Sequence, residues 1–312
     1  MAVIGLAGVG GSAMTGDGGP DGHMLSGTLA TVAFLAGVRP LIPAAERAWI
    51  LAAELEDQAL LNAGDLPGAI RQLQAIHQQV LTRAAADPAS AEWQRDLSVS
   101  HSKLGDLAVA AGDLTAARTS YQASLDIRAR LAAADPANIT RQRDLVVSLE
   151  RLGDVAVAAG DLAAARTAYQ ATLDIRAPLS IADPANAAPQ RDLSISHSKL
   201  GDLAVAAGDL TAARTSYQAA LDIRARLAAV DPANSTWQRD LSISYSKLGD
   251  VAVAAGDLTA ARTSYQASLD IRARLAAADP ANAGWQRDLS AIQQKVDGLG
   301  QAASESGTAF AP

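Results

Sequence analysis

Apolar and small side chains recur at helical spacing along most of the chain. After Trp93, for example, Leu97, Leu104 and Leu107 are separated by seven and three residues, so they lie on one face of a helix. Gly112 follows, and glycine readily adopts the left-handed conformation found at many helix C-termini. This pattern predicts a first amphipathic helix that ends at Gly112.

A second helix is predicted directly after this glycine. The side-chain oxygen of Asp113 can accept a hydrogen bond from a free backbone N–H group of the first turn. Ala117, Tyr121 and Leu125 then follow at intervals of four residues and share one face. Neither helix can bury its apolar face alone, so we expect the pairs to stack on one another.

The same pattern returns every 48 residues. Gln-Arg-Asp-Leu begins at Gln94, Gln142, Gln190, Gln238 and Gln286. We therefore predict five repeats and a C-terminal capping helix: 45–92, 93–140, 141–188, 189–236, 237–284 and the cap at 285–299. Asn138, Asn186, Asn234 and Asn282 follow Asp-Pro-Ala and are well placed as N-caps of the first helices. The recurrent Tyr121 and Trp93 positions are predicted to pack between helices.

These residues resemble the tetratricopeptide repeat (TPR). Leu104-Gly105, Gly112, Ala117 and Tyr121 match its pattern of small and large residues, in which an aromatic ring fills the space left by glycine. The resemblance implies an all-α fold, a right-handed α-solenoid of stacked antiparallel helix pairs that forms a superhelix. The usual period is about 34 residues; the longer period here resembles a bacterial long-helix subtype. The surplus of 14 residues corresponds to about two extra turns in each helix.

Pro178 departs from the pattern, because the equivalent positions in three other repeats hold arginine. A proline well inside a helix removes a backbone hydrogen bond and clashes with the preceding turn. We therefore predict a kink or an early helix end in the second helix of the third repeat.

The ends of the chain differ from the repeats. Residues 1–43 contain ten of the 24 glycines and show no sustained period, so we expect them to be mostly disordered, and 300–312 likewise. The segment Gly5–Ser12 is similar to the phosphate-binding loop of NB-ARC-type signalling NTPases. Gly11 stands where that loop needs lysine, so the segment is expected not to bind nucleotide.

Composition narrows the classes of function. The 26 basic and 33 acidic residues give a net charge of −7, which argues against a nucleic-acid-binding face. There is no cysteine, and His101 and His197 occupy one repeat position on different helices, so we expect no metal site. No apolar run reaches the length of a membrane span. The sequence predicts a cytoplasmic, non-enzymatic protein without a catalytic residue or cofactor.

A surface remains as the candidate site. The TPR resemblance implies that the first helix of each repeat lines a concave groove. The groove positions that we carry over are Val99, Ser102, Lys103, Asp106, Arg151, Asp154, Ser198, Lys199, Asp202, Ser246, Lys247 and Asp250. Two interpretations stay open: each cation pairs in water with the aspartate three residues away on its own helix, or the ladder binds an extended polar partner.

Two classes of function follow from this reading. The first is a protein-interaction scaffold that binds a protein or peptide segment in the groove, with self-association as a further mode of contact. The alternative is a detached regulatory arm of an NB-ARC-type signalling NTPase whose phosphate loop is degenerate.

Overall fold

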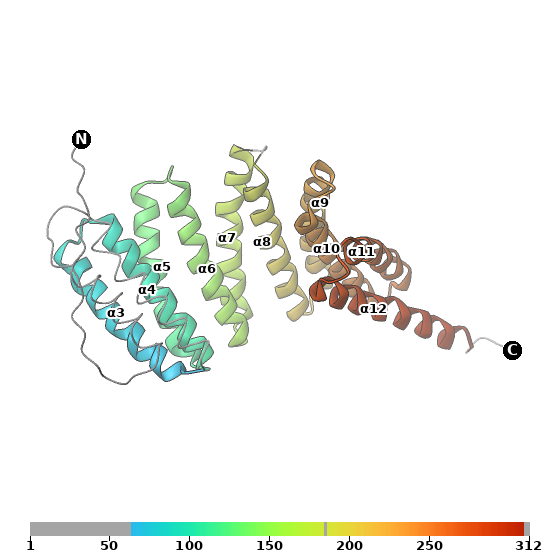
Figure 1. Ribbon diagram of the computed structural model, residues 1–312, viewed down its shortest axis with the longest axis horizontal. Coiled ribbons are helices and arrows are strands. Elements are labelled where there is room, and N and C mark those ends of the chain that lie inside the picture. The colour runs from blue at the N-terminus through green and yellow to red at the C-terminus, as the bar shows by residue number, and fades with distance from the viewer. Residues whose placement is uncertain (1–63, 184–185, 309–312) are drawn as a thin grey trace, which may run out of the picture. The chain divides into compact units, whose positions relative to one another are not determined.

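The computed structural model describes residues 64–183 and 186–308, and the secondary structure within these ranges is entirely α-helical (Figure 1). The described chain divides into two units between residues 79 and 80. Helix α3 (Leu66–Ala86) crosses this boundary. The second unit continues with α4 (Ala91–Ala110), α5 (Leu114–Ala134), α6 (Ile139–Ala158), α7 (Leu162–Ala182), α8 (Ala187–Ala206), α9 (Leu210–Val230), α10 (Ser235–Ala254), α11 (Leu258–Ala278) and α12 (Ala283–Thr308).

Within the second unit, each helix packs against the helix before it and the helix after it in the chain. We call α4, α6, α8, α10 and α12 the first helices, and α5, α7, α9 and α11 the second helices. The contact between one repeat and the next is called a seam. The second helices begin at residues 114, 162, 210 and 258, always 48 residues apart. The predicted fold class, an all-α solenoid of stacked helix pairs, is confirmed.

The turns between helices are made as their sequences predict. Asn234 caps α10, and its side chain accepts a hydrogen bond from the backbone N–H of Trp237 at 3.1 Å. Gly112 has a φ of +77°, the left-handed conformation that a side chain would disfavour. Asp113 then caps α5 by accepting from Ala116 N at 2.9 Å.

Glycine and tyrosine bring the two helices of each repeat together. Tyr217 on α9 is only 2% exposed and lies in a core cluster with Ala213 and Val251. A Cβ atom added to Gly201 on α8 would lie 2.5 Å from Cε1 of this ring. The close approach therefore depends on the absence of a side chain at residue 201.

Pro178 does not end its helix. Helix α7 has 21 residues, as α5 has, and reaches Ala182, so of the two predicted outcomes, a kink or an early end, the early end is wrong. A proline removes one backbone N–H donor, whereas the turn beyond it is held by other contacts. Ser180 is buried, its hydroxyl donates to Ala177 O at 2.8 Å, and Gln190 Nε2 donates to Ser180 O at 2.7 Å.

The last helix caps the array and continues beyond its predicted end. Ile292 and Leu299 of α12 are buried in a cluster with Tyr265. The helix runs on to Thr308, although we predicted an end at 299 and a disordered tail from 300. No proline lies between 300 and 308 to stop it.

Helix α12 also differs from the other first helices in sequence. It has Asp297 followed by Gly298, where the others have glycine followed by aspartate.

Several sequence-based predictions lie outside the described residues. They concern the glycine-rich segment 1–43, the loop-like segment 5–12, the first helix of the first repeat and the last four residues of the tail.

Replacing Gly201 with alanine is expected to destabilise the array. The new methyl group would overlap Tyr217, and overpacking costs about 1–3 kcal/mol, of which alanine's better helix propensity returns up to about 1 kcal/mol. Gly298→Ala is the matched control, because nothing lies within 4 Å of a Cβ atom there. Urea unfolding should show a lower free energy for Gly201→Ala and an equal or higher one for Gly298→Ala. Equal effects would contradict the proposed steric role.

Candidate interaction surface on the first helices

The twelve predicted groove residues all lie on α4, α6, α8 and α10. Most of them are half-buried or exposed, as a binding surface requires. Ser102 and Ser246 are each only 8% exposed and do not fit this role. Ser102 Oγ instead forms a hydrogen bond with Ser124 Oγ at 2.8 Å, because its side chain points into the contact between α4 and α5. We therefore assign Ser102 and Ser246 to packing.

The charged groove residues pair across the seams between repeats. Lys199 on α8 lies three residues before Asp202, yet its Nζ atom contacts Asp154 Oδ1 on α6 at 2.5 Å. The same contact recurs at every seam from α4 to α12: Arg151–Asp106 at 2.7 Å, Lys199–Asp154 at 2.5 Å, Lys247–Asp202 at 2.7 Å and Lys295–Asp250 at 2.5 Å. For Arg151, Lys199 and Lys247, the interpretation that each cation pairs with the aspartate three residues later on its own helix is wrong.

A tyrosine completes each of these contacts. Tyr217 OH donates to Asp202 Oδ1 at 2.5 Å, the same oxygen that Lys247 contacts. The lysine Nζ also lies 5.8 Å from the centre of the tyrosine ring, within the range of a cation–π interaction. One aspartate thus joins the second helix of its own repeat to the first helix of the next. We call this group of three side chains the Tyr–Asp–cation joint.

The environment of these tyrosines favours the neutral phenol. Burial raises the pKa of Tyr217 well above its ordinary value of 10.0, and the hydrogen bond to Asp202 and the negative charge of that carboxylate raise the pKa further. The pKa values of Tyr121, Tyr169 and Tyr265 are raised in the same order of causes. Each hydroxyl therefore remains a hydrogen-bond donor throughout the neutral range.

The two halves of the joint contribute unequally to stability. The Lys247–Asp202 pair is more than a third exposed on both sides, and such surface pairs are worth about 0–1 kcal/mol. A hydrogen bond from a buried hydroxyl to a carboxylate is worth about 1.5–3 kcal/mol. The tyrosine hydroxyl is therefore the stronger half, and the cation is the half that a partner could compete for.

Exposed valines run beside the joints. Each first helix from α4 to α10 carries a valine three residues after its aspartate, with between 38% and 44% of its surface exposed: Val109, Val157, Val205 and Val253. A single exposed apolar side chain is common on protein surfaces, but here one recurs at the same position of four successive first helices. The first helices therefore present a repeating unit of one acid, one cation and one valine.

Buried arginines form a second ladder, which sequence reasoning missed. Arg224 on α9 is only 6% exposed. Its Nε donates to Ser194 Oγ at 3.1 Å within its own repeat, and its Nη1 donates to Ser244 Oγ at 2.8 Å in the next. Burial lowers the pKa of this guanidinium, and the negative charge of Asp240 opposes the shift. Arg128 makes the same contacts two seams earlier, so the recurrence of serine and arginine in register with the repeat was the available signal.

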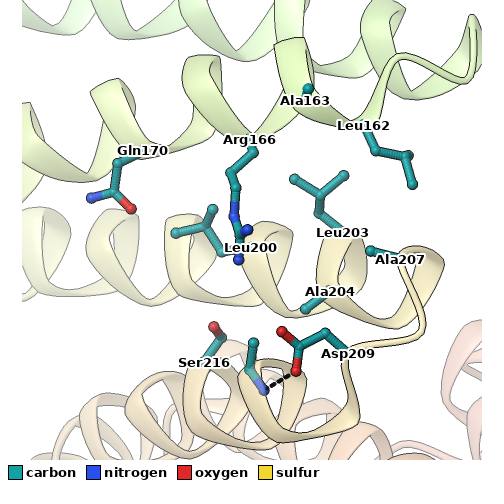
Figure 2. Close-up of a pocket in the computed structure, with 11 residues that line it drawn as sticks. Leu162, Ala163, Arg166, Gln170, Leu200, Leu203, Ala204, Ala207, Asp209 and Ser216 are labelled. Atoms are coloured by element: carbon teal, nitrogen blue, oxygen red, sulfur yellow. Dashed lines mark hydrogen bonds between the residues drawn. The ribbon is translucent and has the colours of Figure 1, made fainter.

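Residues of α7, α8 and α9 line a hollow of about 390 Å³ (Figure 2). Figure 2 shows Arg166 reaching from α7 towards Leu200 and Leu203 of α8. Asp209 is the other charged residue of the lining, and it accepts from Ala212 N at 2.9 Å as the N-cap of α9. These two charged groups do not form the acid–base pair that catalysis would need.

The described residues hold no cluster of three or more histidine, cysteine, aspartate or glutamate side chains that could bind a metal ion. His197 is half-buried on α8, and burial lowers its pKa. Among the described helices, none is long and apolar enough to cross a membrane.

The stacked pairs, the glycine–tyrosine contact and the joints across each seam define a helical-repeat protein with the fold of an α-solenoid. No protein-family model and no curated protein matches the sequence. Among solved structures, the chain is similar to BtubC (BKLC) from P. vanneervenii, with 19% identity and a TM-score of 0.62 over 81% of this chain and 90% of that chain. At this identity the likeness shows the fold alone.

Two structures of MamA are also similar. One covers 70% of this chain and 96% of its own, with 16% identity and a TM-score of 0.39. The other, MamA 41-end from Desulfovibrio magneticus RS-1, covers 71% of this chain and 94% of its own, with 15% identity and a TM-score of 0.36.

Removal of Asp202, which breaks both contacts of the joint, should cost more stability than removal of Lys247, which breaks only one. Asp202→Ala leaves the buried Tyr217 hydroxyl without its acceptor and is expected to lower the free energy of unfolding by about 1.5–3 kcal/mol. Lys247→Ala removes only the half-exposed ion pair and should cost about 0–1 kcal/mol. Urea unfolding of both variants tests this order, and a larger loss for Lys247→Ala would refute it.

The raised pKa of Tyr217 predicts a loss of stability at alkaline pH. The unfolded chain ionises this tyrosine from about pH 10, while the folded chain keeps the phenol neutral, so its contribution is complete below pH 10 and decreases as the pH rises above it. Tyr217→Phe should melt at a lower temperature than the native chain at pH 8, and the gap should narrow by pH 11. Circular dichroism melts at both pH values measure it; a constant gap would contradict the shift.

Proposed function

We propose that this protein is a non-enzymatic scaffold that binds a protein or peptide segment along its first helices. The observation that carries the proposal is the exposed repeating unit of acid, cation and valine on α4, α6, α8 and α10. The core clusters are formed by other residues, so the packing of the helices does not require a valine on this exposed face.

The chemistry of the face favours an extended protein segment over nucleic acid. The net charge of the chain is −7, and each exposed cation of the ladder already faces an aspartate. A partner would gain most of its affinity by covering the valines. Charged groups of the partner would compete for the half-exposed lysines and aspartates and so fix its position along the first helices. Such groups govern specificity and encounter rate more than affinity.

The test is to remove the valines without altering charge. Val157→Gln, Val205→Gln and Val253→Gln are combined in one chain, in which glutamine has the better helix propensity, so the fold is expected to persist. Cross-linking and mass spectrometry after pull-down with the native chain identify captured proteins. Each is then measured against purified variants, and the triple valine variant should bind at least tenfold more weakly.

A control for three simultaneous substitutions on another exposed face lies on the second helices. Arg118, Arg166 and Arg214 occupy one repeat position there, and their combined replacement with glutamine also leaves three exposed helical sites polar. This variant should bind like the native chain. If the arginine variant loses the partner while the valine variant keeps it, the first-helix surface is not the binding face.

A further inference from the structure

Among the four seams between α4 and α12, one lacks an ion pair that the other three share. At those three seams, an arginine near the start of one first helix contacts an aspartate of the next: Arg95–Asp144 at 2.6 Å, Arg191–Asp240 at 2.6 Å and Arg239–Asp288 at 2.7 Å. Arg143 and Asp192 occupy these positions between α6 and α8. Neither side chain forms an ion pair within the described residues, so two opposite charges remain available there.

The arginine of the buried ladder is also redirected at this seam. Val146 replaces the serine that accepts from Arg128 and Arg224 in their own repeats, so Arg176 on α7 has no such acceptor. Its Nη1 keeps the contact to the serine of the next repeat, Ser196 Oγ at 2.8 Å, and also contacts Glu150 Oε1 at 2.7 Å. The backbone carbonyl of Asp192 therefore lacks the bond that Arg224 gives to Asp240 O at 3.3 Å.

A cavity of about 290 Å³ opens at the same place. Its wall includes Val146, Leu179 and Pro189, and the unpaired Arg143 and Asp192 also line it. The corresponding cavity one seam earlier has only about 120 Å³. There Arg141 occupies the position of Pro189 and extends along the wall, with its Nη1 donating to Leu131 O at 3.2 Å.

The rest of the array indicates which group is missing from this cavity. The position of Pro189 holds tryptophan in three of the other first helices. At the last seam, Trp285 lies beside Leu275 and Ala278, the equivalents of Leu179 and Ala182. A hollow of about 420 Å³ remains beside Trp285, so the indole covers part of the wall there, and Pro189 leaves the equivalent part of the wall uncovered.

We propose that this cavity binds a free aromatic amino acid, with tryptophan as the best fit. Its ring takes the place of the missing indole against Leu179 and Pro189. Its carboxylate faces Arg143 and its ammonium group faces Asp192, so both unpaired charges are matched by one ligand of zero net charge. The site is separate from the valine face of the proposed function and does not depend on it.

Isothermal titration of the full chain with L-tryptophan tests the proposal. Tryptamine lacks the carboxylate and indole-3-propionate lacks the ammonium group, and each should bind at least fivefold more weakly. N-acetyl-tryptophanamide, which mimics tryptophan within a peptide, should also bind more weakly. Absence of L-tryptophan binding at millimolar concentration overturns the proposal, as does equal binding of the blocked compound.

Three variants locate the site. Pro189→Trp supplies the missing ring from the chain itself and should weaken binding at least tenfold, and circular dichroism checks that it remains helical. Arg143→Ala should weaken binding several-fold. Arg95→Ala is the matched control, because Arg95 occupies the equivalent position and already forms an ion pair with Asp144. Native-like binding by Pro189→Trp, or equal losses from Arg143→Ala and Arg95→Ala, would place the ligand elsewhere and overturn the proposal.

Discussion

The hydrogen bond from a buried tyrosine to a half-exposed aspartate is the contact on which the rest of the array depends. Tyr217 can bring its hydroxyl to Asp202 only because Gly201 leaves room for the ring between α8 and α9. The aspartate, held in place by that hydroxyl, then receives Lys247 from the next repeat. Packing within one repeat and attachment of the next therefore share a single carboxylate.

The helices and turns could be predicted because their causes are local and repeated five times. Gly112 adopts the left-handed turn that its position requires, and Asn234 caps its helix from the residue just before it. The partner of each charge could not be predicted in this way. Lys199 has Asp202 within reach on its own helix, and only the distance between α6 and α8 decides that Asp154 is its partner.

The buried arginines and the two prolines show a related limit. The recurrence of Ser194 and Arg224 every 48 residues was visible in the sequence, but their contact depends on which faces of α8 and α9 meet. Pro178 obeys the local rule and loses a donor, yet tertiary contacts hold the following turn. Pro189 is an ordinary residue for the first turn of a helix, and its effect on the seam becomes visible only beside Leu179.

The order of Asp297 and Gly298 in α12 makes this helix suited to a repeat before it but not to a second helix after it. Asp250 can receive Lys295 from α12, so this helix accepts the repeat that precedes it. A second helix folded back on α12 would meet the side chain of Asp297 where its tyrosine needs glycine, and would find no carboxylate at Gly298 for its hydroxyl. A duplicated unit of 48 residues therefore finds both the glycine and the carboxylate it needs when it is inserted ahead of α12, whereas α12 offers neither at these two positions.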